Sequence, residues 1–259
     1  MNEVKFLSVI PILLLIIPIL LSNRILKVKM NRELVISIFR MVVQLVFVGL
    51  YLQYIFTLNN WIINLLYLVI MILVASIHSI KSSSLKLHPL LLPIFISVLI
   101  PQVVVLLVFN YFIAGIENLF DAKFIIPVGG MLLGNCLSGN IVALNGFYEG
   151  IKDDEKRYNL TLTLGASRNQ ALLPYLRKSI TRSINPTIAS LATTGLVSLP
   201  GMMTGQILAG AEPFTAIKYQ IAILTAILVA KYFSVLLSLY ISRHKCFNNF
   251  HILDKRIFI

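Results

Sequence analysis

The residues with the most unusual spacing lie in one short apolar stretch, residues 200–210. It reads Pro-Gly-Met-Met-Thr-Gly-Gln-Ile-Leu-Ala-Gly, with adjacent thioethers at Met202 and Met203. Thioethers are soft ligands that suit copper(I) better than iron. Paired methionines in a membrane protein are more often packing residues than ligands. The pair therefore predicts an apolar lining, and the sequence identifies no metal ligands.

The backbone of this stretch is too rich in glycine and proline for a plain membrane helix and too apolar for an ordinary solvated loop. Non-helical backbone at membrane depth persists only where protein buries it or water lines it. We therefore expect a re-entrant or broken segment that forms part of an outer gate beside a translocation path. The residues assigned to it are Pro200, Gly201, Met202, Met203, Gly205 and Gln206.

Charged side chains inside apolar segments are costly, so each is a candidate for function. Arg40 and Gln44 lie one helical turn apart and share a face, so both are assigned to the translocation path. Arg40 and Lys218 can also extend toward the nearer membrane interface. Lys231 lies deeper in its segment and is harder to explain in this way.

Three polar residues of another apolar segment share one face. Asn135, Ser138 and Asn145 are three and ten residues apart, which at about 100° per residue places them close together, while Asn140 points away. Gly130 nearby permits close helix packing. The pattern indicates either a polar pathway or hydrogen bonds between helices, and the sequence leaves both open.

Missing residue types exclude several chemistries. No Asp or Glu lies between Glu33 and Glu117 or inside any of the apolar segments. Proton-coupled transporters typically relay protons through buried carboxylates or histidines. No Gly-x-x-x-x-Gly-Lys-Ser/Thr loop is present to hold nucleotide phosphates. We expect a protein that is not an enzyme, has no catalytic residues and binds no cofactor itself.

Membrane helices must position these residues. Hydrophobic residues make up 58% of the 259 residues and charged residues only 12%, whereas soluble domains carry about a quarter charged residues. We predict an all-α, polytopic integral membrane protein with a single transmembrane domain over residues 1–259. Because a bilayer requires runs of about 20 apolar residues, the predicted spans are 6–23, 34–57, 61–80, 89–113, 124–147, 180–199 and 214–241.

The net charge of +12 has a topological origin rather than a role in nucleic-acid binding. Basic clusters occupy alternate connections, following the first, third, fifth and last predicted spans. Positive charge marks cytoplasmic loops. We therefore predict a multi-pass protein of the lipid bilayer, with its N-terminus outside and its C-terminus in the cytoplasm, and no nucleic-acid partner.

The longest predicted cytoplasmic connection contains an amphipathic segment, residues 158–176. Leu160 and Leu164 lie among polar residues there, and Gly165 breaks the pattern in the middle. Such a segment can lie along the membrane surface as a simple linker, or it can dock into the groove of a partner. Amphipathicity alone favours the simple linker.

Several strings together resemble a known family. They are Arg-Met-Val-Val-Gln-Leu from Arg40, Leu-Gly-Ala-Ser-Arg from Leu164, the 200–210 stretch, and Pro-Phe-Thr-Ala-Ile-Lys-Tyr-Gln-Ile from Pro213. In these strings the chain resembles the FetB-type permeases, membrane subunits of a bacterial ABC transporter implicated in iron export. Plant aluminium-tolerance half-transporters resemble the same family.

The resemblance implies a permease of the bacterial inner membrane that exports iron or another metal. It implies a homodimer, two copies of a separate ABC ATPase subunit that bind the ATP, and a coupling helix that contacts this ATPase. The implied coupling residues are Leu160, Leu164, Gly165, Ala166, Ser167 and Arg168. Importers of this type carry an acidic residue six positions before the glycine, whereas this chain has Asn159.

Two other functions remain open from the sequence. A self-sufficient secondary transporter of a small solute would be favoured by inverted repeats or a buried carboxylate relay, and neither is visible. A membrane scaffold that transports nothing is the third alternative. A neighbouring ATPase gene and co-purification of its product would separate the three.

Overall fold

The computed structural model describes residues 9–114, 120–248 and 250–259, and nearly all of them are helical. Five of the described helices are long and apolar enough to cross a membrane. The all-α, polytopic membrane architecture expected from composition is confirmed. The described chain divides into two compact units, one ending at Leu58 and one spanning Asn59–Ile259, and each is described by itself.

The first unit contains α1 (Ile10–Leu14), α2 (Ile17–Ile25) and α3 (Asn31–Leu58). The first predicted span, 6–23, is therefore two short helices whose prolines lie at their first turns, and residues 6–8 lie outside the described part. Asn31 donates from Nδ2 to the Leu20 carbonyl at 3.1 Å and so ties the start of α3 to α2.

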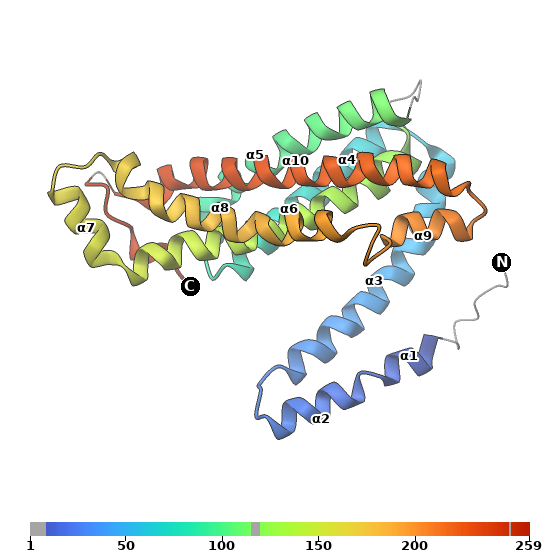
Figure 1. The fold of residues 1–259 in the computed structure, drawn as a ribbon, viewed down its shortest axis with the longest axis horizontal. Helices are drawn as coiled ribbons and strands as arrows, with labels where there is room; N and C mark the ends of the chain where they lie inside the picture. Colours follow the sequence, from blue (N-terminus) through green and yellow to red (C-terminus); the bar gives the residue numbers. More distant parts are fainter. Residues whose placement is uncertain (1–8, 115–119, 249) are drawn as a thin grey trace. The chain divides into compact units, whose positions relative to one another are not determined.

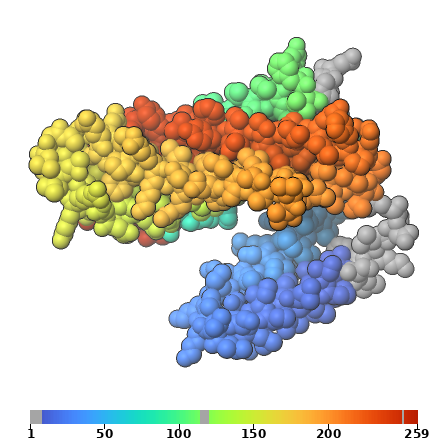
Figure 2. All heavy atoms as spheres, in the orientation of Figure 1, coloured from blue at the N-terminus to red at the C-terminus, as the bar shows by residue number. Residues whose placement is uncertain are grey.

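The second unit is a helical bundle built around α6 (Ala122–Asp153), which packs against α4 (Trp61–Ser82), α8 (Arg168–Thr193) and α10 (Pro213–Cys246). A further helix, α5 (Leu87–Phe109), packs mainly on α10 and continues into a π turn, Asn110–Ala114. Figure 2 shows α8 along the surface of this unit.

Two short helices mark opposite ends of the second unit (Figure 1). At one end, called here the α7 end, α7 (Glu155–Thr163) lies near the C-terminus of the chain. At the other, the α9 end, α9 (Gly201–Leu208) packs against α10. A 3₁₀ turn, Lys255–Ile257, follows α10.

Packing in this unit relies on close approach and hydrogen bonds, because burial of apolar surface gives helices little advantage over lipid. Gln102 donates from Nε2 to the Gly129 carbonyl at 2.9 Å, and an added Cβ at Gly129 would lie 3.1 Å from the Leu68 side chain. Close packing was expected at Gly130, where the nearest neighbour of an added Cβ, Met71, is at 3.4 Å.

The predicted boundaries of the sixth span are wrong. The sequence suggested 180–199, whereas α8 runs over Arg168–Thr193. It starts early because Ser167 and Gln170 form a capping box, with the Ser167 N–H donating to Gln170 Oε1 at 2.8 Å. Its first half is polar, so α8 is not among the five apolar helices. The count of seven crossings stays a prediction.

Candidate functional site

A lysine in the middle of the longest helix forms the most unusual polar site of the second unit. Lys231 lies on α10, eighteen residues after Pro213, and is only 5% exposed. Its ammonium donates from Nζ to Thr187 Oγ1 on α8 at 2.8 Å. The residues beside it line a cavity of about 290 Å³ between α6, α8 and α10, including Asn135, Thr187, Ser190 and Lys231.

A glycine makes room for this lysine. A Cβ added at Gly139 on α6 would lie 2.7 Å from Lys231 Cε and 2.9 Å from Cγ, closer than real contacts allow. The aliphatic part of the Lys231 side chain therefore packs against α6 at a position that has no side chain. The hydroxyl of Ser183 donates to the Gly139 carbonyl at 2.9 Å and joins α8 to the same point.

The three residues of the predicted polar face of α6 have different surroundings in the structure. Asn135 lines the Lys231 cavity and donates from Nδ2 to its own helix at the Met131 carbonyl, 2.9 Å away. Ser138 is exposed and donates to the Asn135 carbonyl at 3.0 Å. Asn145 is half-buried near the α7 end. The hydrogen bonds of Asn135 and Ser138 are therefore not between helices.

Bonds between helices come from residues that the face prediction left out. Asn140, which points away from that face, is fully buried and donates from Nδ2 to Ser234 Oγ on α10 at 2.9 Å. Tyr148 donates its hydroxyl proton to Ser242 Oγ on α10 at 2.7 Å. Asn140 and Tyr148 are eight residues apart on α6, and Ser234 and Ser242 are eight residues apart on α10. This equal spacing is the sequence signal from which the two pairs could have been predicted.

The 200–210 stretch forms the short helix α9 between two turns. The chain leaves α8 after Thr193, turns through Gly195 and re-enters a helix at Gly201, after the N-cap Pro200; Gly210, with φ of +97°, precedes α10. This agrees with the expected broken segment. Met203 is buried, whereas the faces at Gly201 and Gly205 are open.

The other residues assigned to the path lie on α9 and on α3. Met202 and Gln206 are half-buried on α9, and none of the assigned α9 residues lines the Lys231 cavity. Arg40 and Gln44 are exposed on α3 of the first unit. Among the described residues, no group of three or more His, Cys, Asp or Glu side chains could hold a metal ion.

The turn between α7 and α8 is centred on Gly165, as the sequence indicated. Gly165 has φ of +90°, a left-handed conformation that favours glycine. Leu160 and Leu164 are 58% and 79% exposed, so both present apolar surface at the α7 end. Ala166 is half-buried and Ser167 caps α8.

The side chain of Arg168 makes its contacts within the chain. It donates from Nη2 to the Arg243 carbonyl at the end of α10, and its guanidinium lies 4.9 Å from the centre of the Phe247 ring. Burial, and next the neighbouring charge of Arg243, lower the pKa of Arg168. The six predicted coupling residues therefore lie together, but Ser167 and Arg168 hold the turn in place while the two leucines are free to contact a partner.

The C-terminal segment folds back onto the same end, which sequence reasoning missed. Tyr158 donates its hydroxyl proton to the His251 carbonyl at 2.7 Å, and Lys255 pairs with Glu155 at 2.8 Å, so the tail holds α7. The Lys86 N–H donates to the Ile257 carbonyl at 2.7 Å, which joins the tail to the α4–α5 connection.

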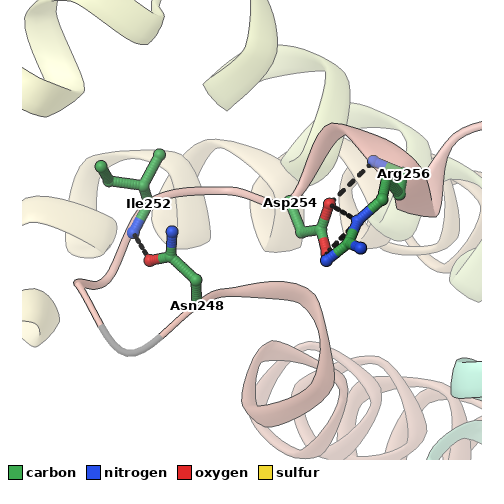
Figure 3. A network of polar contacts seen from close by, with 4 residues as sticks. All are labelled: Asn248, Ile252, Asp254 and Arg256. Atoms are coloured by element: carbon green, nitrogen blue, oxygen red, sulfur yellow. Dashed lines mark hydrogen bonds and ion pairs between the residues drawn. The ribbon is translucent and has the colours of Figure 1, made fainter.

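Short-range polar contacts shape the tail itself (Figure 3). Asn248 accepts from the Ile252 N–H at 2.9 Å, and Asp254 accepts from the Arg256 side chain at 2.9–3.1 Å. The hydrogen bonds from Arg256 lower the pKa of the Asp254 carboxyl.

On α8, burial and the nearby Asp154 carboxylate raise the pKa of Tyr175 to about 12.

Comparisons with known proteins cover nearly the whole chain. The family described as "Uncharacterised protein family (UPF0014)" matches residues 6–247. The "Probable iron export permease protein FetB" of Escherichia coli K12 is 30% identical over 240 residues, covering 93% of this chain and 91% of that protein. The UPF0014 membrane protein YjkA of Bacillus subtilis is 31% identical, covering 76% of this chain and 77% of the relative.

A plant protein matches a shorter part. The protein ALUMINUM SENSITIVE 3 of Arabidopsis thaliana is 33% identical over 139 residues, which covers 54% of this chain and 51% of that protein. No solved structure matches the chain.

Proposed function

The chain belongs to the UPF0014 family of multi-pass membrane proteins, and from that premise we propose that it is the permease subunit of an ABC transporter that exports a metal from the cytoplasm. The single observation that carries this proposal is the similarity over 93% of the chain to a protein named as an iron export permease. In the proposed assembly, two copies of the chain form one transmembrane domain each, and ATP is hydrolysed by separate ATPase subunits.

The α7 end supports a contact with an ATPase subunit. Gly165 turns the chain sharply between two helices, and Leu160 and Leu164 stand exposed beside it. The capping box of α8, the Arg168 contacts and the folded tail hold the backbone of this turn in place. The two exposed leucines are therefore attached to a well-ordered backbone. An apolar pair on a rigid turn suits insertion into a groove of a partner.

The α9 end suits an outer gate. The structure leaves open space around an added Cβ at Gly201 and Gly205 within its own chain, so this face is available to a second copy. With the basic connections in the cytoplasm, the N-terminus lies outside and the α7 end lies inside. The proposed membrane is the bacterial inner membrane.

A site-specific crosslink tests the proposed partner. A photoreactive amino acid at Leu164 should form a covalent product whose second chain is an ABC ATPase, recognised by peptides that carry its phosphate-binding loop. Leu164→Asp and Gly165→Trp should release that ATPase while the permease stays in the membrane. Truncation of a well-packed contact residue typically costs about 2 kcal/mol or more, equivalent to about thirtyfold in affinity.

Leu196 provides the matched control, since it is 90% exposed in the connection between α8 and α9. Leu196→Asp introduces the same charge at the opposite end and should leave the ATPase bound. Undiminished co-purification of both α7-end variants would disprove the assignment of the coupling segment. A crosslink at Leu164 to a protein without ATPase motifs would disprove the ABC assignment itself.

A further inference from the structure

Lys231 places a buried cation in the middle of α10. It lies eighteen residues from the start of α10 and fifteen from its end, which at 1.5 Å per residue is about 27 Å and about 22 Å. At 34 residues, α10 is longer than a bilayer core of about 30 Å, so its ends do not mark the interfaces. The ammonium is directed sideways to Thr187 rather than along α10 toward either end.

No carboxylate of the described chain neutralises this charge. The three ion pairs found among the described residues involve Asp154, Glu155 and Asp254, all near the α7 end. The remaining described acidic residues lie in connections or within five residues of a helix end. An isolated buried charge is costly unless it is paired.

The cavity beside Lys231 provides donors for an anion. Thr187 and Ser190 each carry a hydroxyl, and Asn135 has a second amide N–H besides the one donated to Met131. At about 290 Å³ the cavity is at the lower limit of small-molecule sites. Because Ser190 is exposed, the cavity is open on one side and can hold one compact group of a larger solute.

We propose that this cavity binds an oxyanion group of the transported solute, with Lys231 as its counter-charge and Thr187, Ser190 and Asn135 as hydrogen-bond donors. The inference rests on the proposed transport function and narrows its substrate class. The metal leaves the cell as a chelate whose carboxylate or phosphate oxygens remain negative. A bare divalent cation would meet an uncompensated positive charge in this cavity.

Direct binding to the purified full-length protein in lipid nanodiscs tests this site without an ATPase. The probes are citrate, ferric citrate, inorganic phosphate and Mn²⁺, each followed by titration calorimetry. We expect wild-type protein to bind citrate or phosphate, and Lys231→Met to bind at least about tenfold more weakly, because a hydrogen bond to a charged group is lost. Thr187→Val should weaken binding in the same direction.

Lys218→Met is the matched control, since Lys218 is exposed near the start of α10 and its Nζ lies 4.9 Å from the centre of the Phe214 ring. This variant should bind the anions as wild type does. Lys231→Arg keeps the charge and should retain more binding than Lys231→Met, which also shows that the site is still folded.

Equal anion binding by wild type and Lys231→Met, or binding of Mn²⁺ alone, would overturn the inference. So would the absence of anion binding at millimolar probe from a protein that still exports metal with its ATPase, in which case the proposed function stands without this site. Lysine-dependent anion binding by a chain that associates with no ATPase would leave the site standing and disprove the ABC assignment.

Discussion

Replacement of Gly139 by alanine should displace Lys231 without removing its charge. The added Cβ would lie 2.7 Å from Lys231 Cε and 3.2 Å from Val235 Cγ2. Carbon atoms in contact are normally about 3.5–4.0 Å apart, so the lysine stem must move by about 1 Å. That shift is enough to take the 2.8 Å bond from Nζ to Thr187 out of hydrogen-bonding range.

Two costs combine in this variant. Overpacking a close-packed site costs about 1–3 kcal/mol, and a lost hydrogen bond to a charged group costs about 1.5–3 kcal/mol. Because the two effects share one cause, they do not add fully, and we expect the free energy of unfolding to fall by about 2–4 kcal/mol. Titration of the detergent-solubilised protein with SDS measures this quantity.

A double-mutant cycle isolates the contact. In a Lys231→Ala background the obstructing Cγ and Cε atoms are gone, so Gly139→Ala should cost less than about 1 kcal/mol there. Gly134→Ala on the same helix is the control, since nothing lies within 4 Å of its added Cβ, and it should be neutral or slightly stabilising. An equal cost for Gly139→Ala in both backgrounds would refute the reasoning.

Two further predictions concern the α9 end and the topology. Gly201→Val or Gly205→Val should block export from membrane vesicles while the protein stays folded and ATPase-bound. The space around both glycines is open within the chain, so any crowding by valine must come from a second copy. Normal export by both variants would show that α9 is a passive connection. Single cysteines at the exposed Lys123 and Lys245, introduced after replacement of the free, buried Cys136 and Cys246, should respond oppositely to an impermeant thiol reagent on intact cells. Labelling at Lys245 but not at Lys123 would reverse the proposed orientation.

Most long helices could be predicted because the bilayer requirement is a property of local composition. The predicted spans 34–57, 61–80 and 214–241 each match a helix, α3, α4 and α10, within about five residues at either end. The break at Gly165 was also visible, since a lone glycine in an amphipathic run marks a point where the helix can turn. The start of α8 was missed although its Ser167-x-x-Gln170 signal is local.

Partners of buried polar residues could not be predicted in the same way. Helical periodicity predicts the face of α6 on which Asn135 or Asn140 lies. The hydrogen-bond partners of that face depend on which helix packs against it. Only the packing of α6 on α10 shows that Asn140 meets Ser234, ninety-four residues away.

Composition by itself determined that this chain is a membrane protein, because 12% charged residues cannot cover a water-soluble surface of this size. The strings around Leu164 and residues 200–210 determined the family that it resembles. The tertiary structure alone decided that Gly139 makes room for Lys231, that Thr187 Oγ1 accepts a hydrogen bond from its ammonium, and that a cavity remains beside it. These contacts join three helices far apart in sequence, and no local pattern encodes the distance between them.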